Sequence, residues 1–291
     1  MAFLDHIRLC NSFDLARYRP FKIARRTLGW VRDDFVTMLA GRPDLFMVQP
    51  HAVVLAPALA DAAQRSAAVD AFLRDLRTQG MFKAWREERY PVSASFGEEP
   101  AMEMERAAVA AFGIRAYGVH LTGYVRRHDG LHVWVATRAR NKPTYPGMLD
   151  NTVAGGQPAG LSLFDNLVKE CKEEAGIGEA MARQAKPVGF VTYCMEQHDG
   201  LKPDILYNFD LELPGDFVPR NTDGELEKFE LWPVAAVMEK VRDTGAFKFN
   251  CNLVLIDFFI RHGLIAADHV DYFELVSGLH SHVRGPDGLT R

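Results

Sequence analysis

Hydrophobic positions in the first part of the chain predict a mixture of helix and strand. Residues 67–80 place apolar side chains at intervals of three and four and end on a glycine, which is typical of a helix and its stop signal. The residues concerned are Val69, Phe72, Leu73, Leu76 and Gly80. A short apolar run at 53–55 predicts a strand, and residues 93–101, which include Gly97 and Pro100, predict a loop. This part of the chain is therefore expected to form an α+β unit.

From residue 117 the pattern changes to an alternation of Val and aromatic residues with other types. Two such runs flank a turn signal at residues 128–130 and predict a hairpin over 117–138. Further strands are predicted near 188–195, 206–213 and 228–232, and helices over 162–175, 233–242 and 252–261. The second part is thus predicted to be a mixed sheet with helices, and the fold class of the whole chain is α+β.

Length and composition predict two folded domains. The chain has 291 residues, of which 48% are hydrophobic, more than one small core requires. We expect an N-terminal α+β accessory domain over residues 1–115, a second domain over 116–275 and a C-terminal tail over 276–291. The 34 Lys and Arg residues against 38 Asp and Glu leave a net charge of −4, which argues against nucleic acid or an anionic membrane as a partner. A charged substrate must therefore be bound locally, and no feature predicts an oligomeric state.

The cysteines and the N-terminus favour a reducing compartment. Cys10, Cys171, Cys194 and Cys251 are far apart with no CxxC pair, so we expect them to be reduced and mostly buried. The N-terminal residues contain no apolar segment of the signal-peptide type. They are rich in arginine, as transit sequences are, but Asp5 and Asp14 are uncharacteristic of such sequences. No stretch reaches the roughly 18 apolar residues of a membrane helix. These observations predict a cytoplasmic location.

Three glutamates stand out in the helix predicted over 162–175. Glu170, Glu173 and Glu174 are spaced i, i+3 and i+4, which places their carboxylates on one helical face. On the same helix an apolar stripe is expected to be buried: Phe164, Leu167, Val168, Cys171 and Ala175. Like charges this close repel one another, so a divalent cation would stabilise them, and carboxylate oxygens suit Mg²⁺ or Mn²⁺.

An ordinary solvated helical face is the alternative interpretation of these glutamates. A loop containing Gly155, Gly156 and Gly160 leads into the helix and favours the metal site instead. Glycine backbone can approach a ligand closely, and the amides at a helix N-terminus attract anions. The loop and the helix together suggest a site for a metal and a diphosphate.

Residues 155–177 resemble the Nudix box, in which a glycine, five residues, a glutamate and seven residues precede Arg-Glu-apolar-x-Glu-Glu-x-Gly-apolar. The matching residues are Gly155, Glu170, Cys171, Glu173, Glu174, Gly176 and Ile177. Leu161 and Lys169 replace a glutamate and an arginine that tend to pair in the family, so a supporting salt bridge is expected to be lost. The resemblance implies an α/β/α sandwich that hydrolyses phosphoanhydrides. It also implies a metal bound by Gly155 and the three glutamates, with Glu173 and Glu174 catalytic.

A narrower resemblance covers nearly the whole chain. Residues 138–156, with upstream pieces such as 85–90 and 112–125, are similar to Nudix proteins related to thiamine pyrophosphokinase, which carry an extra N-terminal domain. The resemblance implies hydrolysis of thiamine diphosphate, or of its oxidised damaged forms, to the monophosphate.

Candidate substrate contacts and a further acid lie outside the helix. Arg138, Arg140 and Lys142 precede the glycine loop and, together with Gly156, are candidates for contact with a diphosphate. A later loop offers Glu225, Glu227 and Glu230 as an additional catalytic carboxylate, although a solvated loop explains them equally well. Possible walls for an aromatic heterocycle are Tyr193, Gln197 and Trp232. His198 has no second ligand nearby and is not expected to bind metal.

Three other functions compete with this interpretation. An isopentenyl diphosphate isomerase would need a cysteine where this chain has Val153 and Ala154. A general nucleotide-sugar or dinucleotide pyrophosphatase shares every catalytic feature, and a binding module that has lost turnover is the third alternative. For the cluster Trp85, Arg86, Glu87, Glu88 and Tyr90 we predict a packing or inter-domain role. The N-terminal domain is expected to pack against the site and to restrict which diphosphates enter.

Overall fold

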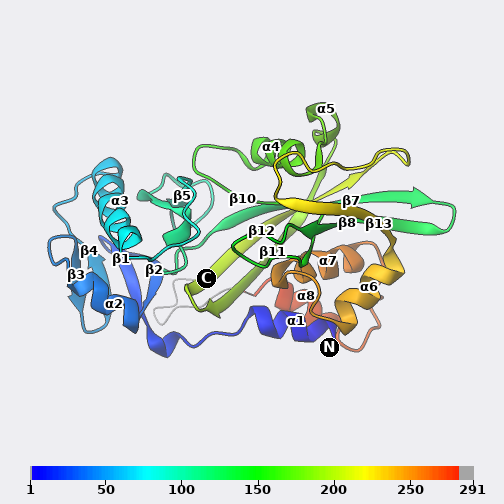
Figure 1. The fold of residues 1–291 in the computed structure, drawn as a ribbon. Helices are drawn as coiled ribbons and strands as arrows, with labels where there is room; N and C mark the ends of the chain where they lie inside the picture. The colour runs from blue at the N-terminus through cyan, green and yellow to red at the C-terminus, as the bar shows by residue number, and fades with distance from the viewer. Residues whose placement is uncertain (1, 282–291) are drawn as a thin grey trace.

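The computed structural model describes residues 2–281. Its N-terminal part consists of α1 (Phe3–Cys10), β1 (Tyr18–Ile23), β2 (Arg26–Arg32), α2 (Asp33–Ala40), β3 (Phe46–Gln49), β4 (Ala52–Leu55), α3 (Ala62–Thr78), β5 (Arg89–Val92) and β6 (Met102–Glu105), with 3₁₀ turns η1 (Leu15–Arg17) and η2 (Arg106–Ala108). A four-stranded sheet has the order β2-β1-β4-β3, with β1 and β4 parallel and the other neighbours antiparallel. We call this sheet, together with α2, α3, β5, β6 and η2, the N-terminal unit. Figure 1 shows its sheet, α2 and α3 in blue and cyan at one end of the molecule.

The predicted helix over 67–80 is confirmed as part of α3. The helix begins earlier, at Ala62, because the Asp61 carboxylate accepts a hydrogen bond from the Gln64 N–H and so caps the N-terminus. Its apolar stripe is buried against the N-terminal sheet and β6, as its spacing predicted. The strand at 53–55 is also confirmed, as β4, and residues 93–101 form a loop.

The second part is built around a seven-stranded mixed sheet. It contains β7 (Tyr117–Arg127), β8 (Gly130–Arg138), β9 (Leu149–Asp150), β10 (Val153–Gly156), α4 (Leu163–Ala175), α5 (Glu179–Ala182), β11 (Lys186–Gln197), β12 (Gly200–Glu212), β13 (Leu226–Pro233), α6 (Val234–Asp243), α7 (Phe249–Arg261) and α8 (Tyr272–Leu279). The order is β11-β12-β7-β8-β13, with β10 beside β7 and β9 beside β8. β7 and β12 run parallel, and the other pairs are antiparallel.

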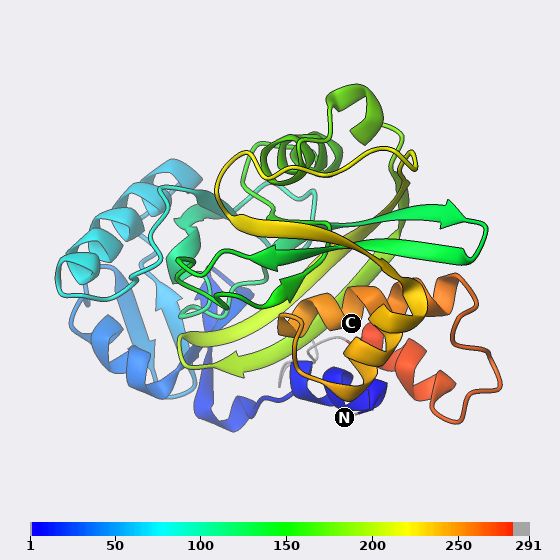
Figure 2. The ribbon, with the colours of Figure 1, turned by 45° about the vertical axis from the view of Figure 1, so that its right-hand side comes forward.

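Helices cover both faces of this sheet. α4 packs on one face through Leu167, Cys171 and Ala175, whereas α6, α7 and α8 pack on the other (Figure 2). The predicted α/β/α sandwich and the α+β fold class are therefore confirmed. The hairpin, the three later strands and the helices 233–242 and 252–261 are found as β7 and β8, β11, β12 and β13, and α6 and α7.

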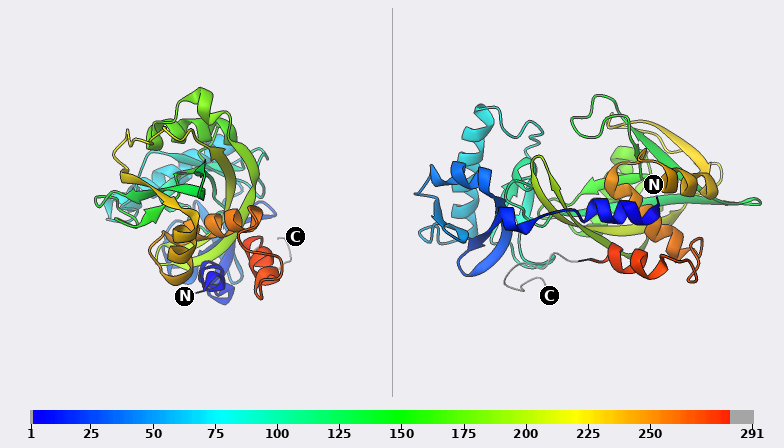
Figure 3. Two further views of the ribbon diagram at one scale, coloured as in Figure 1. Left: turned by 90° about the vertical axis from the view of Figure 1, so that its right-hand side faces the viewer. Right: turned by 90° about the horizontal axis from the view of Figure 1, so that it is seen from below.

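The first helix belongs to the second core rather than to the N-terminal unit. Phe3 and Ile7 of α1 are buried with α7 and α8, and the Phe3 and Phe259 rings lie 6.1 Å apart. Figure 3 shows the chain crossing from α1 to the N-terminal sheet. At the other end, α8 runs across residue 276, where the tail was expected to begin, and residues 282–291 lie outside the described part.

The cysteine prediction is confirmed, since Cys10, Cys171, Cys194 and Cys251 are all buried and free. Within residues 2–281, no helix combines the length and the apolar character needed to cross a membrane.

Candidate active site

A cleft of about 260 Å³ opens between the N-terminal unit and the mixed sheet. Its walls come from β5 and η2 on one side and from β7, β10, the loop 139–148 and the start of α7 on the other. Among the described residues, six of the lining side chains are cationic: Arg86, Arg106, Arg138, Lys142, Lys202 and Lys248. These cations outnumber the four acidic side chains in the described part of the lining, Glu174, Asp199, Asp204 and Glu225, so the cleft suits an anionic ligand even though the whole chain is acidic.

Helix α4 forms where it was predicted because both of its ends are capped. The Ser162 hydroxyl accepts a hydrogen bond from the Asp165 N–H at 3.1 Å, and Gly176 takes the left-handed φ of 63° that ends the helix. The predicted apolar stripe is buried at Leu167, Cys171 and Ala175 and only partly buried at Phe164 and Val168. These caps and contacts fix the direction in which the glutamates point.

The three glutamates of α4 are not equivalent. Glu170 and Glu174 are buried, with 9% and 6% of their surface exposed. The Glu173 side chain is 46% exposed and forms an ion pair with Lys169 at 2.8 Å. The Lys169 Nζ also lies 3.0 Å from Glu170 Oε1. Lys169 thus contacts two of the carboxylates, while Leu161, at the other substituted position, is exposed.

Both buried glutamates contact β10, and Gly155 and Gly156 belong to this strand rather than to the predicted loop, because both pair with β7. The Ala154 N–H donates a hydrogen bond to Glu174 Oε2 at 2.8 Å. A Cβ atom on Gly155 would lie 2.3 Å from both Cγ and Cδ of Glu170, so only glycine fits there. Glu174 also lines the cleft. The end of α4 and the backbone of β10 therefore meet at the cleft wall.

The environment of these carboxyl groups suits a bound cation. Burial raises the pKa of Glu174 well above its ordinary value, against the effect of the Ala154 hydrogen bond, and the nearby Asp150, Glu170 and Glu225 raise it further. Burial also raises the pKa of Glu170, which Lys169 opposes. In residues 2–281 no group of three or more His, Cys, Asp or Glu side chains is already arranged around a metal position. The donor set still fits a hard divalent cation, because carboxylate oxygens are its preferred ligands and its charge would favour their ionised form.

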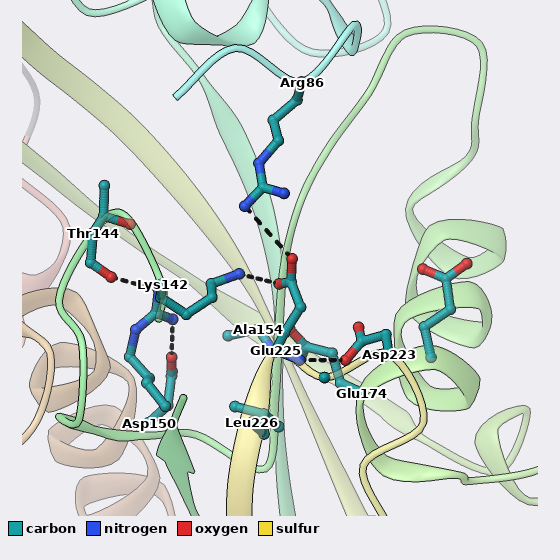
Figure 4. Close-up of polar contacts among 12 residues, drawn as sticks. Arg86, Lys142, Thr144, Asp150, Ala154, Glu174, Asp223, Glu225 and Leu226 are labelled. Atoms are coloured by element: carbon teal, nitrogen blue, oxygen red, sulfur yellow. Dashed lines mark hydrogen bonds and ion pairs between the residues drawn. The ribbon is translucent and has the colours of Figure 1, made fainter. Parts of the chain in front are cut away.

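Glu225 lies at the centre of a charged group in the cleft (Figure 4). Lys142 Nζ contacts Glu225 Oε2, and Arg86 Nη2 lies 3.7 Å from Oε1. Although burial acts to raise the pKa of Glu225, the hydrogen bond from Lys142 and the charges of Lys142, Arg86 and Arg106 lower it below its ordinary value. Of the three acids singled out in this loop, Glu225 alone lines the cleft. Glu227 is exposed and lies near Arg140, and the half-buried Glu230 pairs with Lys228.

The three basic residues before the glycine loop occupy different environments. Arg138 is buried and donates to Asp150 Oδ2 at 2.7 Å and to the carbonyls of Thr144 and Tyr145 at 3.0 Å. Arg138 therefore braces the loop 139–148. The Arg140 side chain is 87% exposed, whereas that of Lys142 is 10% exposed and lines the cleft. Lys142 is thus the best placed of the three to meet a phosphate.

The cleft is also lined by Tyr193, Asp204 and His120. The Tyr193 hydroxyl donates to Asp204 Oδ2 at 2.7 Å, and His120 Nδ1 lies 2.8 Å from Asn151 Oδ1. Burial lowers the pKa of His120 to about 4, and the Lys248 charge acts in the same direction. Of the three suggested walls, Tyr193 alone lines the cleft. Gln197 bonds to Tyr145, and Trp232 packs on the α6 side of the sheet.

Several lining residues carried no signal in the sequence. Arg106, Lys202, Asp204 and Lys248 are charged residues from three different segments, with Lys202 and Asp204 both on β12, and only the fold brings them together. The cluster at 85–90 does have the predicted inter-domain role, since Arg86 and Tyr90 both face the cleft. His198 is exposed and is not among the residues that line the cleft.

Comparisons with known proteins cover both parts of the chain. Residues 2–116 match a family model described as a domain of unknown function, DUF4743. The chain is 41% identical over 288 residues to Nudix hydrolase 20, chloroplastic, of Arabidopsis thaliana, covering 95% of this chain and 77% of that protein. It is 40% identical over 277 residues to Nudix hydrolase 24, chloroplastic, of the same plant, covering 94% and 76%. A solved Nudix domain of Shewanella oneidensis NrtR, complexed with ADP ribose, superposes with a TM-score of 0.41 and 14% identity over 52% of this chain and 91% of that one.

Proposed function

The chain belongs to the Nudix hydrolase family, and from that premise we propose that its cleft binds a small diphosphate and hydrolyses the phosphoanhydride bond. The observation that carries this proposal is the position of Glu170 and Glu174, buried against β10 where α4 meets a cation-lined cleft. These two carboxylates, Glu173 and the Gly155 carbonyl would hold Mg²⁺ or Mn²⁺. A cation there would neutralise charge on the phosphate oxygens and make an attacking water more acidic.

The remaining groups of the cleft have roles that follow from their charges. Lys142 lines the cleft and would meet a phosphate as a point charge. When Lys142 turns to the substrate, Glu225 loses its hydrogen bond and becomes able to accept the proton of the attacking water. Glu173 and Glu174 are the catalytic carboxylates of α4 in this proposal, and Glu225 is the additional carboxylate, which acts as the base. Water then attacks one phosphorus, the bridging oxygen leaves with the other phosphate, and the proton is released from the carboxylate.

For the substrate we propose thiamine diphosphate or its oxidised forms. This choice follows from what the resemblance of residues 138–156 to thiamine pyrophosphokinase-related Nudix proteins implies. The cleft is consistent with it, since cations lie beside β10 while Tyr193, Phe249 and the Asp204 carboxylate line another part of the wall. Aromatic rings and a carboxylate suit a heterocycle that carries hydrogen-bond donors. The cytoplasmic location remains a prediction, because the two plant relatives are named as chloroplastic.

The test is product release from a panel of diphosphates with and without Mg²⁺. The panel contains thiamine diphosphate, its oxo and oxy forms, ADP-ribose and NADH. Metal-dependent release of a monophosphate, fastest from the damaged thiamine forms, is the expected result. A preference for ADP-ribose or NADH would overturn the proposed substrate but would agree with the proposed hydrolase activity. No release from any compound, with metal and ligand still bound, would mean a binding module.

A further inference from the structure

The N-terminal unit directly contacts the end of β10 and the loop that follows this strand. Tyr90 of β5 is buried, and a Cβ atom on Gly156 would lie 1.6 Å from its hydroxyl oxygen. The backbone of this unit also bonds to the loop, since the Ala159 N–H donates to the Arg89 carbonyl at 2.8 Å. The glycine at 156 is therefore required by a residue of the N-terminal unit. This contact places the unit beside the proposed metal and diphosphate site.

Tyr90 in turn positions an arginine above the same glycine. The Arg106 guanidinium carbon lies 5.8 Å from the centre of the Tyr90 ring, and a Cβ on Gly156 would be 3.7 Å from that carbon. Arg106 Nη1 donates to Glu88 Oε2 at 2.8 Å, which fixes one edge of the guanidinium. Among the described residues this is its one hydrogen bond, and a guanidinium has five N–H donors. Donors therefore remain on a cation that lines the cleft next to Gly156.

We propose that Arg106 binds a phosphate group of the substrate beside Gly156, so that the N-terminal unit completes the diphosphate site. Planar guanidinium groups bind phosphate through paired hydrogen bonds, and the surrounding cleft excludes part of the competing water. The ligand chemistry rests on the proposed function, because the anion is taken to be a diphosphate. The domain of unknown function then supplies a substrate-binding residue, in addition to any role as a selective wall.

The experiment measures binding of inorganic diphosphate to the full-length protein by calorimetry, with and without Mg²⁺. Arg106→Gln removes the charge, and Arg106→Lys keeps the charge but not the paired geometry. Arg77→Gln is a matched control, because the side chains of Arg77 and Arg106 are both 47% exposed. Arg77 also resembles Arg106 in pairing with a glutamate and stacking on an aromatic ring, but it does not line the cleft.

Arg106→Gln is expected to weaken diphosphate binding about tenfold or more, as loss of a charge-assisted hydrogen bond implies. The diphosphate affinity of Arg106→Lys should lie between those of Arg106→Gln and the unchanged protein. Arg77→Gln should bind diphosphate as tightly as the unchanged protein. Binding by Arg106→Gln within about twofold of the unchanged protein, or no diphosphate binding by the unchanged protein, would overturn the inference. If diphosphate binding depends on Arg106 but the protein hydrolyses no diphosphate, the proposed hydrolase activity is overturned and the proposed role of Arg106 is supported. Equal thermal unfolding of the Arg106→Lys and Arg77→Gln proteins would show that the comparison is made between folded chains.

Discussion

The side chain of Glu170 occupies the space that a Cβ atom on Gly155 would need, with Cγ and Cδ both 2.3 Å from that position. A glycine in β10 and a glutamate in α4 are thus matched across the proposed metal site. The match explains in physical terms why this glycine and this glutamate occur together in the motif. It also provides the first of the predictions that follow.

Gly155→Ala should displace Glu170 and impair both folding and turnover. The added methyl group meets a buried side chain, and overpacking of this kind costs about 2 kcal/mol of unfolding free energy. Misplacement of a metal ligand should lower kcat on the order of 100-fold. Urea unfolding and steady-state kinetics measure the two effects. Gly178→Ala is the control, because a Cβ there meets nothing within 4 Å and should change neither quantity.

Glu174→Gln should abolish most turnover while the fold persists. The amide oxygen can still accept the hydrogen bond from Ala154, and the substitution removes a carboxyl group whose pKa burial raises. We expect kcat to fall about 100-fold or more, with unfolding free energy unchanged or higher. Glu179→Gln, on the exposed helix α5, is the matched control. Equal losses of stability and activity in Glu174→Gln would instead identify the glutamate as structural.

Lys142→Gln should raise KM about tenfold, because a nearly buried cation that lines the cleft is lost. The same substitution removes the hydrogen bond that helps to keep the pKa of Glu225 low in the free enzyme. The acid limb of the pH profile of kcat/KM should therefore move to higher pH. Arg140→Gln is the control and should change KM by no more than about twofold, since that side chain is exposed. Similar KM increases in both variants would contradict the assignment of Lys142 to the cleft.

Arg138→Gln should act on stability rather than on substrate binding. Its loss leaves the Asp150 carboxylate buried without its ion-pair partner, which costs about 3 kcal/mol. The loop 139–148 also loses the two carbonyl contacts that hold it. Chemical denaturation measures the unfolding free energy of Arg138→Gln and of Arg140→Gln, which remove a buried and an exposed arginine respectively. A stable Arg138→Gln protein with a large increase in KM would mean that Arg138 binds substrate after all.

His120 should make the protein less stable in mild acid. Burial lowers its pKa from 6.5 to about 4, so between these values the unfolded chain binds more protons than the folded one. The contribution of the neutral imidazole to stability is complete above pH 6.5 and is lost as the pH falls toward 4. It amounts to about 3 kcal/mol. His120→Gln can keep the hydrogen bond to Asn151 and should show a smaller loss of unfolding free energy over this range. The same acid dependence in both proteins would show that other groups cause it.

The helices and strands, and the motif that carries the candidate metal ligands, could be recognised in the sequence because their signals are local. The apolar spacing of residues 67–80 and 162–175 predicts two amphipathic helices, and the turn at residues 128–130 predicts the hairpin. The spacing of Gly155 and the α4 glutamates similarly predicts a candidate metal site. Each of these signals involves residues that lie close together in the chain, so a side-chain pattern reveals them.

The tertiary structure alone decided how the candidate residues differ from one another. Spacing cannot distinguish Arg138 from Lys142, yet Asp150 and two carbonyls accept hydrogen bonds from the first, whereas the second contacts Glu225 in the cleft. Nor does it distinguish Glu225 from Glu227, or show that Arg106 and Tyr90 lie above Gly156. Burial, partner charges and close approach depend on contacts between segments that are distant in sequence. Some of these contacts, such as that between Lys142 and Glu225, form within the mixed-sheet domain, and others, such as that between Tyr90 and Gly156, form where the N-terminal unit packs against it. A pattern of residue types along the sequence does not reveal either kind.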